Sequence, residues 1–218
     1  MNIVYQGDIM KKLMTQIKNT VYSSKHIINF IIVLFLIGIV LGSLFMIFIS
    51  KEDQLYIIKQ ITLYFNNIKK GSDQVLGLVL FKNDVINNIF QLFIIYILGL
   101  SIVGILVVIV IMILKGFILG LSISGILLKY KLSGVVATFL YVFPVYFLKV
   151  LLYVFASLFA IKTSIKFINA ILKKDQINFK TFLGTYTISF IISIIGIIIL
   201  SLLDSYLTPF LLKFFTIL

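Results

Sequence analysis

The stretch Gln91–Gly125, QLFIIYILGLSIVGILVVIVIMILKGFILGLSISG, decides the fold of this 218-residue chain. A single lysine, Lys115, interrupts its apolar run, and Gly116 follows at once. About 20 apolar residues already cross a bilayer, and this run is longer than a helix of a globular protein can bury. We therefore predict two membrane helices that meet at a tight turn at Lys115-Gly116.

The composition of the whole chain also favours a membrane protein. Hydrophobic residues make up 61% of the chain and charged residues 12%, and the mean hydropathy is +1.20. These values are typical of a polytopic membrane protein. The 19 basic residues are all lysines, scattered between apolar runs, so the net charge of +12 is interpreted as a topology signal and not as a nucleic-acid-binding surface.

The apolar runs predict an all-α membrane bundle with about five transmembrane helices. The predicted spans are 27–49, 85–114, 116–128, 132–161 and 181–203. The third run is only about 20 Å long as a helix, so it crosses if flanking lysines snorkel or the bilayer thins, and otherwise re-enters. Pro144 is expected to kink the fourth span, because proline removes a helical hydrogen bond.

The predicted organisation is a basic arm, residues 1–26, followed by one integral membrane domain, residues 27–218. Small residues four apart predict close helix packing on two of the spans, since they let backbones approach. These residues are Gly38 and Gly42 on the first span, and Gly116, Gly120 and Ser124 on the third.

Residues 50–84 form the only sizeable segment predicted to be exposed to water. Ser50-Lys-Glu-Asp53 fits a helix-capping box, and Gly71 is a plausible helix end. Between them Leu55, Ile58, Ile61, Phe65 and Ile68 recur at helical spacing. This amphipathic helix is predicted to dock a partner, with the membrane surface and the protein's own spans as alternative neighbours.

Lysine bias predicts the orientation of the chain. The arm, Lys115 and the lysine-rich loop 162–180 are predicted to be cytoplasmic, and residues 50–84 extracytoplasmic. The N-terminus is then cytoplasmic and the C-terminus, beyond the short tail that starts at Asp204, extracytoplasmic.

The residues do not predict an enzyme. The chain has no cysteine and one histidine, His26, so it cannot assemble a histidine-based zinc site or a catalytic triad, and no cofactor or small-molecule substrate is expected. Among the acids, only Asp204 is placed at the edge of a span. Lys149 lies inside the fourth span and is a candidate functional group. Either it pairs with Asp204, or it snorkels while Asp204 caps a turn.

Four segments resemble the stage II sporulation protein M family. They are KEDQLYIIKQITLYFNNIKKG (51–71), ILGLSIVG (97–104), LKGFILGLSISG (114–125) and DSYLTPFLLK (204–213). Asp204 and Pro209 keep the family's spacing. The wider superfamily often has P-H-G-x-x-E where this chain has Pro144-Val-Tyr-Phe-Leu-Lys149, so no role of that histidine and glutamate is transferred.

The resemblance implies a non-enzymatic scaffold in the mother-cell membrane of an endospore former. It implies that the protein anchors the peptidoglycan-remodelling machinery of forespore engulfment, with stage II sporulation proteins D and P as partners. The alternative is a small transporter or the membrane subunit of one, which Lys149 and the proline-interrupted span would suit.

Overall fold

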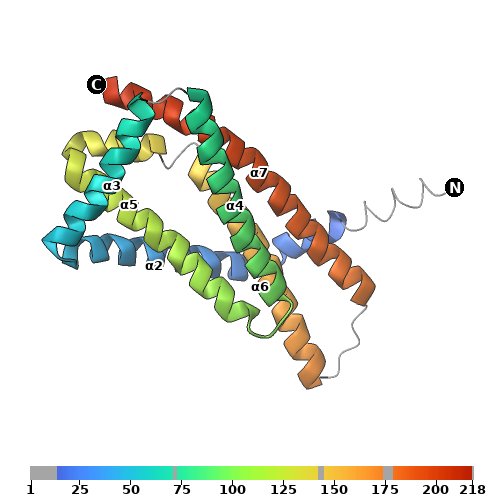
Figure 1. Ribbon diagram of the computed structural model, residues 1–218. Helices are drawn as coiled ribbons and strands as arrows, with labels where there is room; N and C mark the ends of the chain where they lie inside the picture. The colour runs from blue at the N-terminus through green and yellow to red at the C-terminus, as the bar shows by residue number, and fades with distance from the viewer. Residues whose placement is uncertain (1–13, 71–72, 142–144, 174–178, 218) are drawn as a thin grey trace.

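The computed structural model describes residues 14–70, 73–141, 145–173 and 179–217 (Figure 1). Within these ranges every regular element is a helix, which confirms the all-α prediction. Residues 14–22 are helical, and six longer helices follow: α2 (Lys25–Phe48), α3 (Lys51–Lys70), α4 (Asp73–Gly99), α5 (Gly104–Tyr141), α6 (Phe147–Lys173) and α7 (Phe179–Ile217).

Five helices of the described chain are long and apolar enough to cross a membrane, as predicted. These candidate spans are Lys25–Phe48, Gly77–Gly99, Gly104–Leu140, Phe147–Leu172 and Phe182–Leu211. Their number is confirmed, but the second, third and fourth start or end elsewhere than predicted, and the fifth extends beyond its predicted end at residue 203.

The predicted turn at Lys115-Gly116 is wrong, because both residues lie inside α5. The chain turns between Gly99 and Gly104 instead. A Cβ at Gly104 would lie 2.6 Å from the Cα of Gly99, so only glycine allows so close a turn. Ser164 of α6 donates a hydrogen bond to the carbonyls of Gly99 (3.1 Å) and Ser101 (2.8 Å), which pairs the buried groups of the turn.

Because the chain turns at residues 100–103, the short third span predicted at 116–128 is part of the longer helix α5. The predicted second span, 85–114, is divided between α4 and α5, and α5 gains the apolar residues before Lys115. Between Gly104 and Leu128 the helix rises about 36 Å, enough to cross a bilayer core of about 30 Å. Neither thinning of the bilayer nor re-entry is needed.

A reversal at Lys131 ends the long straight part of α5. Its φ of 51° and ψ of −127° are not helical, and this positive φ favours glycine. Residues 132–141 therefore fold back, with Gly134 close to the carbonyl of Ile126. The predicted fourth span, 132–161, is corrected to α6. Pro144 and its predicted kink lie outside the described residues.

Four glycines bring α2 and α5 into backbone contact. A Cβ added to Gly38, Gly42, Gly116 or Gly120 would lie closer than 3.0 Å to a carbonyl oxygen of the other helix. The helices run in the same direction, since Gly38 faces Gly116 and Ser43 Oγ donates to the carbonyl of Gly120 at 3.3 Å. The structure thus brings the predicted packing glycines together, while Ser124 lies half-buried further along α5.

Helix α3 packs partly on the protein itself. Ser50 caps it, accepting the Asp53 N–H at 3.2 Å. Phe65 is 3% exposed and packs with Ile126 and Ala137, joined by the half-buried Ile61.

Half of the predicted docking face is therefore covered, because the reversed end of α5 lies beneath it. Phe65 is buried and unavailable to a partner, and Ile58 and Ile61 are half-buried. Leu55 remains 65% exposed, and Tyr56 (64%) and Leu63 (44%) are exposed beside it. The side chain of Ile68, and Gly71, lie outside the described residues.

The described parts of the predicted arm, lysine-rich loop and tail are largely helical. The described part of the arm packs on the bundle, where Thr185 donates to Gln16 at 2.9 Å and Lys162 reaches the Thr20 carbonyl at 3.4 Å. Residues 162–173 continue α6, so the predicted lysine-rich loop is largely helix. The tail after Asp204 continues α7 through Pro209.

The helix directions alternate so that the bundle has two distinct ends. Helices α2, α5 and α7 run one way, and α4 and α6 the other (Figure 1). We call the end with the 100–103 turn and Lys162 the turn end. The opposite end, with α3 and the Lys131 reversal, is the α3 end.

Candidate functional site

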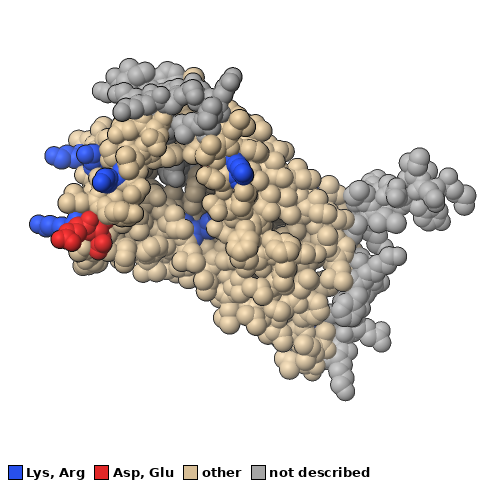
Figure 2. Space-filling view, viewed as in Figure 1, with Lys and Arg blue, Asp and Glu red and all other residues tan. Residues whose placement is uncertain are grey.

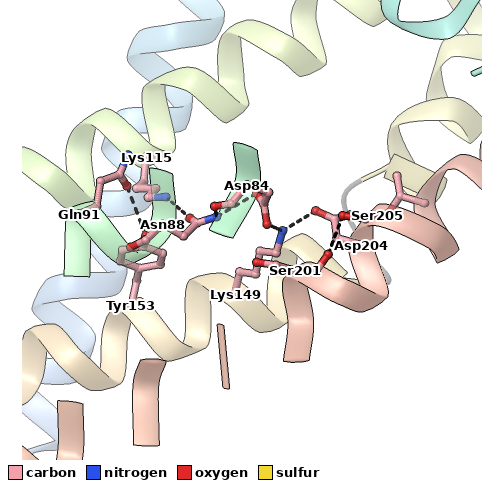
Figure 3. A network of polar contacts seen from close by, with 10 residues as sticks. Asp84, Asn88, Gln91, Lys115, Lys149, Tyr153, Ser201, Asp204 and Ser205 are labelled. Atoms are coloured by element: carbon pink, nitrogen blue, oxygen red, sulfur yellow. Dashed lines mark hydrogen bonds and ion pairs between the residues drawn. The ribbon is translucent and has the colours of Figure 1, made fainter. Parts of the chain in front are cut away.

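A buried lysine joins three helices inside the bundle (Figure 3). Lys149, on the first turn of α6, is 4% exposed. Its Nζ donates to Oδ2 of Asp84 on α4 at 2.7 Å and to Oδ2 of Asp204 on α7. The snorkelling alternative for Lys149 is therefore wrong, and Asp204 pairs with it. Asp84, placed in a loop by the sequence reasoning, lies within α4.

The remaining carboxylate oxygens are also hydrogen-bonded. Thr208 Oγ1 donates to Asp204 Oδ1 at 2.5 Å, and Asn88 Nδ2 donates to Asp84 Oδ1 at 2.8 Å. A cation at a helix N-terminus is disfavoured by the helix dipole, and Lys149 occupies that position on α6. Two carboxylates offset this effect, so the three charges form one interdependent group.

Asn88 extends this group to a second lysine (Figure 3). Its Oδ1 accepts from Lys115 Nζ at 2.9 Å and from the Tyr153 hydroxyl at 2.9 Å. The Lys115 ammonium lies 4.0 Å from the centre of the Tyr153 ring, a cation–π distance. Lys115 of α5, predicted at a cytoplasmic turn, is thus part of an internal network with α4 and α6.

The network lies at membrane depth. From the turn end, Lys115 is about 16 Å up α5 and Asp84 about 22 Å up α4, at 1.5 Å per residue. The hydrocarbon core is about 30 Å thick, so Lys115 lies near its middle and Asp84 nearer the α3 end. Charges at this depth are expensive unless they are paired. Two lysines and two aspartates give the network a formal charge of zero.

Two cavities meet at Asp84 and Asp204. The larger, about 630 Å³, lies among α4, α5 and α6 and includes both lysines of the network. The smaller, about 340 Å³, lies beneath α3 and is lined by Ile61 and Phe65. The charged network therefore has open space on two sides.

Most of the outer surface, by contrast, is uncharged. In the view of Figure 2 most of the charged side chains gather at the left edge, one further lysine stands on the tan face, and another is visible in a central hollow. Many large apolar side chains of α2, α5 and α7 are exposed, as lipid-facing surfaces require.

Three members of this site, Asp84, Asn88 and Gln91, were not predicted as functional residues. The prediction placed Asp84 in the exposed segment 50–84, and Asn88 and Gln91 near the start of the span 85–114. A signal was present: these residues are spaced i, i+4 and i+7, so they share one face of an otherwise apolar helix. Tyr153 carries no comparable signal. The predicted packing residues Gly38 and Gly120 belong to the α2–α5 contact and lie apart from the network.

Five apolar spans around a buried network of charges define a multi-pass membrane protein. The stage II sporulation protein M family matches residues 31–209. The chain belongs to this family of sporulation-related membrane proteins, which is not a known enzyme family. The match extends from α2 to Pro209 and so includes the whole network. Comparison with curated proteins and with solved structures gives no match.

Proposed function

We propose that the protein is a non-enzymatic membrane scaffold that localises peptidoglycan-remodelling proteins during forespore engulfment. Membership of the stage II sporulation protein M family carries this proposal. The proposed partners are stage II sporulation proteins D and P, held at the mother-cell side of the septum.

The placement of α3 supports a docking role. One side of α3 is anchored on α5 through Phe65, while Leu55, Tyr56 and Leu63 stay exposed. An exposed apolar patch beside charged residues is typical of a protein-binding surface. The predicted docking face is accordingly redefined as these three residues.

The distribution of lysines supports a cytoplasmic turn end. Lys18 and Lys25 precede and begin α2, and Lys162 and Lys166 lie on α6 at the same end. Positive residues near span ends favour the cytoplasm. The α3 end, with Tyr56, is then extracytoplasmic, where wall-remodelling partners act.

Site-directed cross-linking tests the docking face. The chain has no cysteine, so a single Tyr56→Cys variant carries one defined attachment point. A cysteine-directed photocross-linker at this position in sporulating cells is expected to capture protein D or P. The control is Leu172→Cys, 75% exposed at the turn end, which is expected to capture neither.

A matched pair of variants separates docking from folding. Changing Leu55, Tyr56 and Leu63 to serine is expected to abolish co-purification of both partners while the protein stays inserted. Serine at Ile171 and Leu172 is the control, because these residues are equally exposed at the other end. Unchanged recruitment by the α3 variant contradicts the docking face, and undisturbed engulfment on deletion of the protein contradicts the scaffold itself.

A second candidate is the membrane subunit of a transporter. The intramembrane charges Lys149 and Asp204 beside a cavity favour it, because such groups often line substrate pathways. Uptake of solutes by reconstituted vesicles that is lost in Lys149→Met would support transport. Co-purification with wall-remodelling proteins, without any uptake, would support the scaffold.

A further inference from the structure

The larger cavity changes character along the membrane normal. Towards the α3 end its wall is polar, with the ion-paired Asp84, Asp204 and Lys149. Towards the turn end it is lined by apolar side chains, among them Ile94 and Leu106. A space that is polar at one end and apolar at the other fits an amphipathic molecule that lies along the membrane normal.

This cavity opens sideways, between α4 and α5. The two helices diverge from their shared turn (Figure 1), and the central hollow of Figure 2 lies between them. Four exposed residues of α5 line the opening at intervals of four: Leu106, Val110, Leu114 and Ile118. Since this face of the helix is at membrane depth, the opening faces lipid chains.

Lys115 is the cation of this wall that makes no direct ion pair among the described residues. Lys149 binds two carboxylates, whereas Lys115 Nζ contacts only the neutral Asn88 amide and the Tyr153 ring. No carboxylate of the described residues lies within 4.0 Å of it. The negative charge that balances Lys115 in the neutral network is therefore reached only through Asn88, and the ammonium can donate directly to an anionic oxygen that enters the cleft.

We propose that this cleft binds a phosphate-bearing lipid. The phosphate lies against Lys115, with the Asn87 and Gln91 amides on the same wall, and a hydrocarbon chain runs along the α5 stripe from Leu114 to Leu106. The volume of about 630 Å³ lies within the range of about 300–1,000 Å³ typical of ligand sites. The site is independent of the scaffold proposal, because it needs neither α3 nor a protein partner.

Fluorescence quenching in detergent tests the proposal. The chain has no tryptophan, so Leu106→Trp introduces a single reporter at the apolar end of the cleft. The protein is held in dodecyl maltoside, which contains no phosphate. The probes are phosphatidylglycerol and diacylglycerol, each brominated on its chains. Phosphatidylglycerol is expected to quench at a concentration about tenfold lower, since a charge-assisted hydrogen bond contributes about 1.5–3 kcal/mol and 1.4 kcal/mol corresponds to tenfold.

The charge of Lys115 is then tested directly. Lys115→Gln in the Leu106→Trp background is expected to remove the preference for phosphatidylglycerol. Lys82→Gln, an exposed lysine of α4, is the matched control and is expected to keep it. Phe93→Trp, exposed on α4 outside the cavity, reports nonspecific quenching and is expected to show no preference.

Three results would overturn the proposal. They are equal quenching by the two lipids at Leu106→Trp, a preference that survives Lys115→Gln, and displacement of the lipid by equimolar glycerol phosphate, which would indicate a soluble phosphate ligand. Native mass spectrometry of the unsubstituted protein provides a second measurement, since phosphatidylglycerol is expected to stay bound and diacylglycerol to dissociate. Loss of both lipids in this measurement is a fourth result that would overturn the proposal.

Discussion

Removing the Lys149 ammonium is predicted to destabilise the bundle more than removing either aspartate. Lys149→Met leaves the carboxylates of Asp84 and Asp204 inside the bundle without their shared cation. Breaking a buried ion pair by deleting one partner costs about 3–5 kcal/mol. Asp204→Asn leaves Lys149 paired with Asp84, so its cost is that of one weakened hydrogen-bonded contact, about 1–3 kcal/mol.

The double variant shows whether the charges act as one group. Lys149→Met together with Asp204→Asn removes both the cation and one of the carboxylates that it leaves behind. The loss of stability is therefore expected to fall short of the sum of the two single losses by about 1–3 kcal/mol. Adding Asp84→Asn, which removes the last carboxylate, is expected to restore part of the stability.

Equilibrium unfolding in detergent micelles, followed by helix content as dodecyl sulfate is titrated, measures these free energies. The control cycle pairs Asp204→Asn with Lys82→Met, because Lys82 is exposed and makes no ion pair with Asp204 among the described contacts. That cycle is expected to be additive. Losses in the Lys149–Asp204 cycle that add within about 0.5 kcal/mol would refute the interdependence derived from the geometry.

Three further predictions concern the packing of the spans. Gly116→Leu places a side chain against the α2 backbone and is expected to prevent the α2–α5 contact, so a cross-link between cysteines on α2 and α5 should be lost; unchanged cross-linking contradicts it. Lys131→Gly relieves the positive φ and is expected to raise the unfolding midpoint, whereas Leu132→Gly, beside it, lowers it. Phe65→Ala is expected to cost about 3–5 kcal/mol by leaving a cavity beneath α3, and Leu55→Ala, which is exposed, less than 1 kcal/mol; equal losses in unfolding titrations contradict this burial.

The sequence was sufficient for the fold class and for the packing glycines. Apolar length alone reveals spans, and the spacing of Gly38 and Gly42 reveals a close contact surface without a known partner helix. The turn was wrongly predicted at Lys115-Gly116, because Lys115 was interpreted as an interfacial residue. The actual turn lies between Gly99 and Gly104, where residues 100–103 contain no charge and no proline. Two glycines five apart were the available signal.

The charged network was harder to predict from the sequence, because its charges are paired between different helices. Lipid depth makes each charge unfavourable by itself, so rules applied to one span at a time move charged residues to span ends. In this bundle Lys115 and Lys149, Asp84 and Asp204 come from four different helices and sum to zero. The free-energy cost of placing these charges in the membrane falls only when the helices assemble, and the sequence of a single helix does not show this pairing. Pairing charges across the apolar runs, with Asn88 as a bridge, predicts such a site better than placing each charge alone.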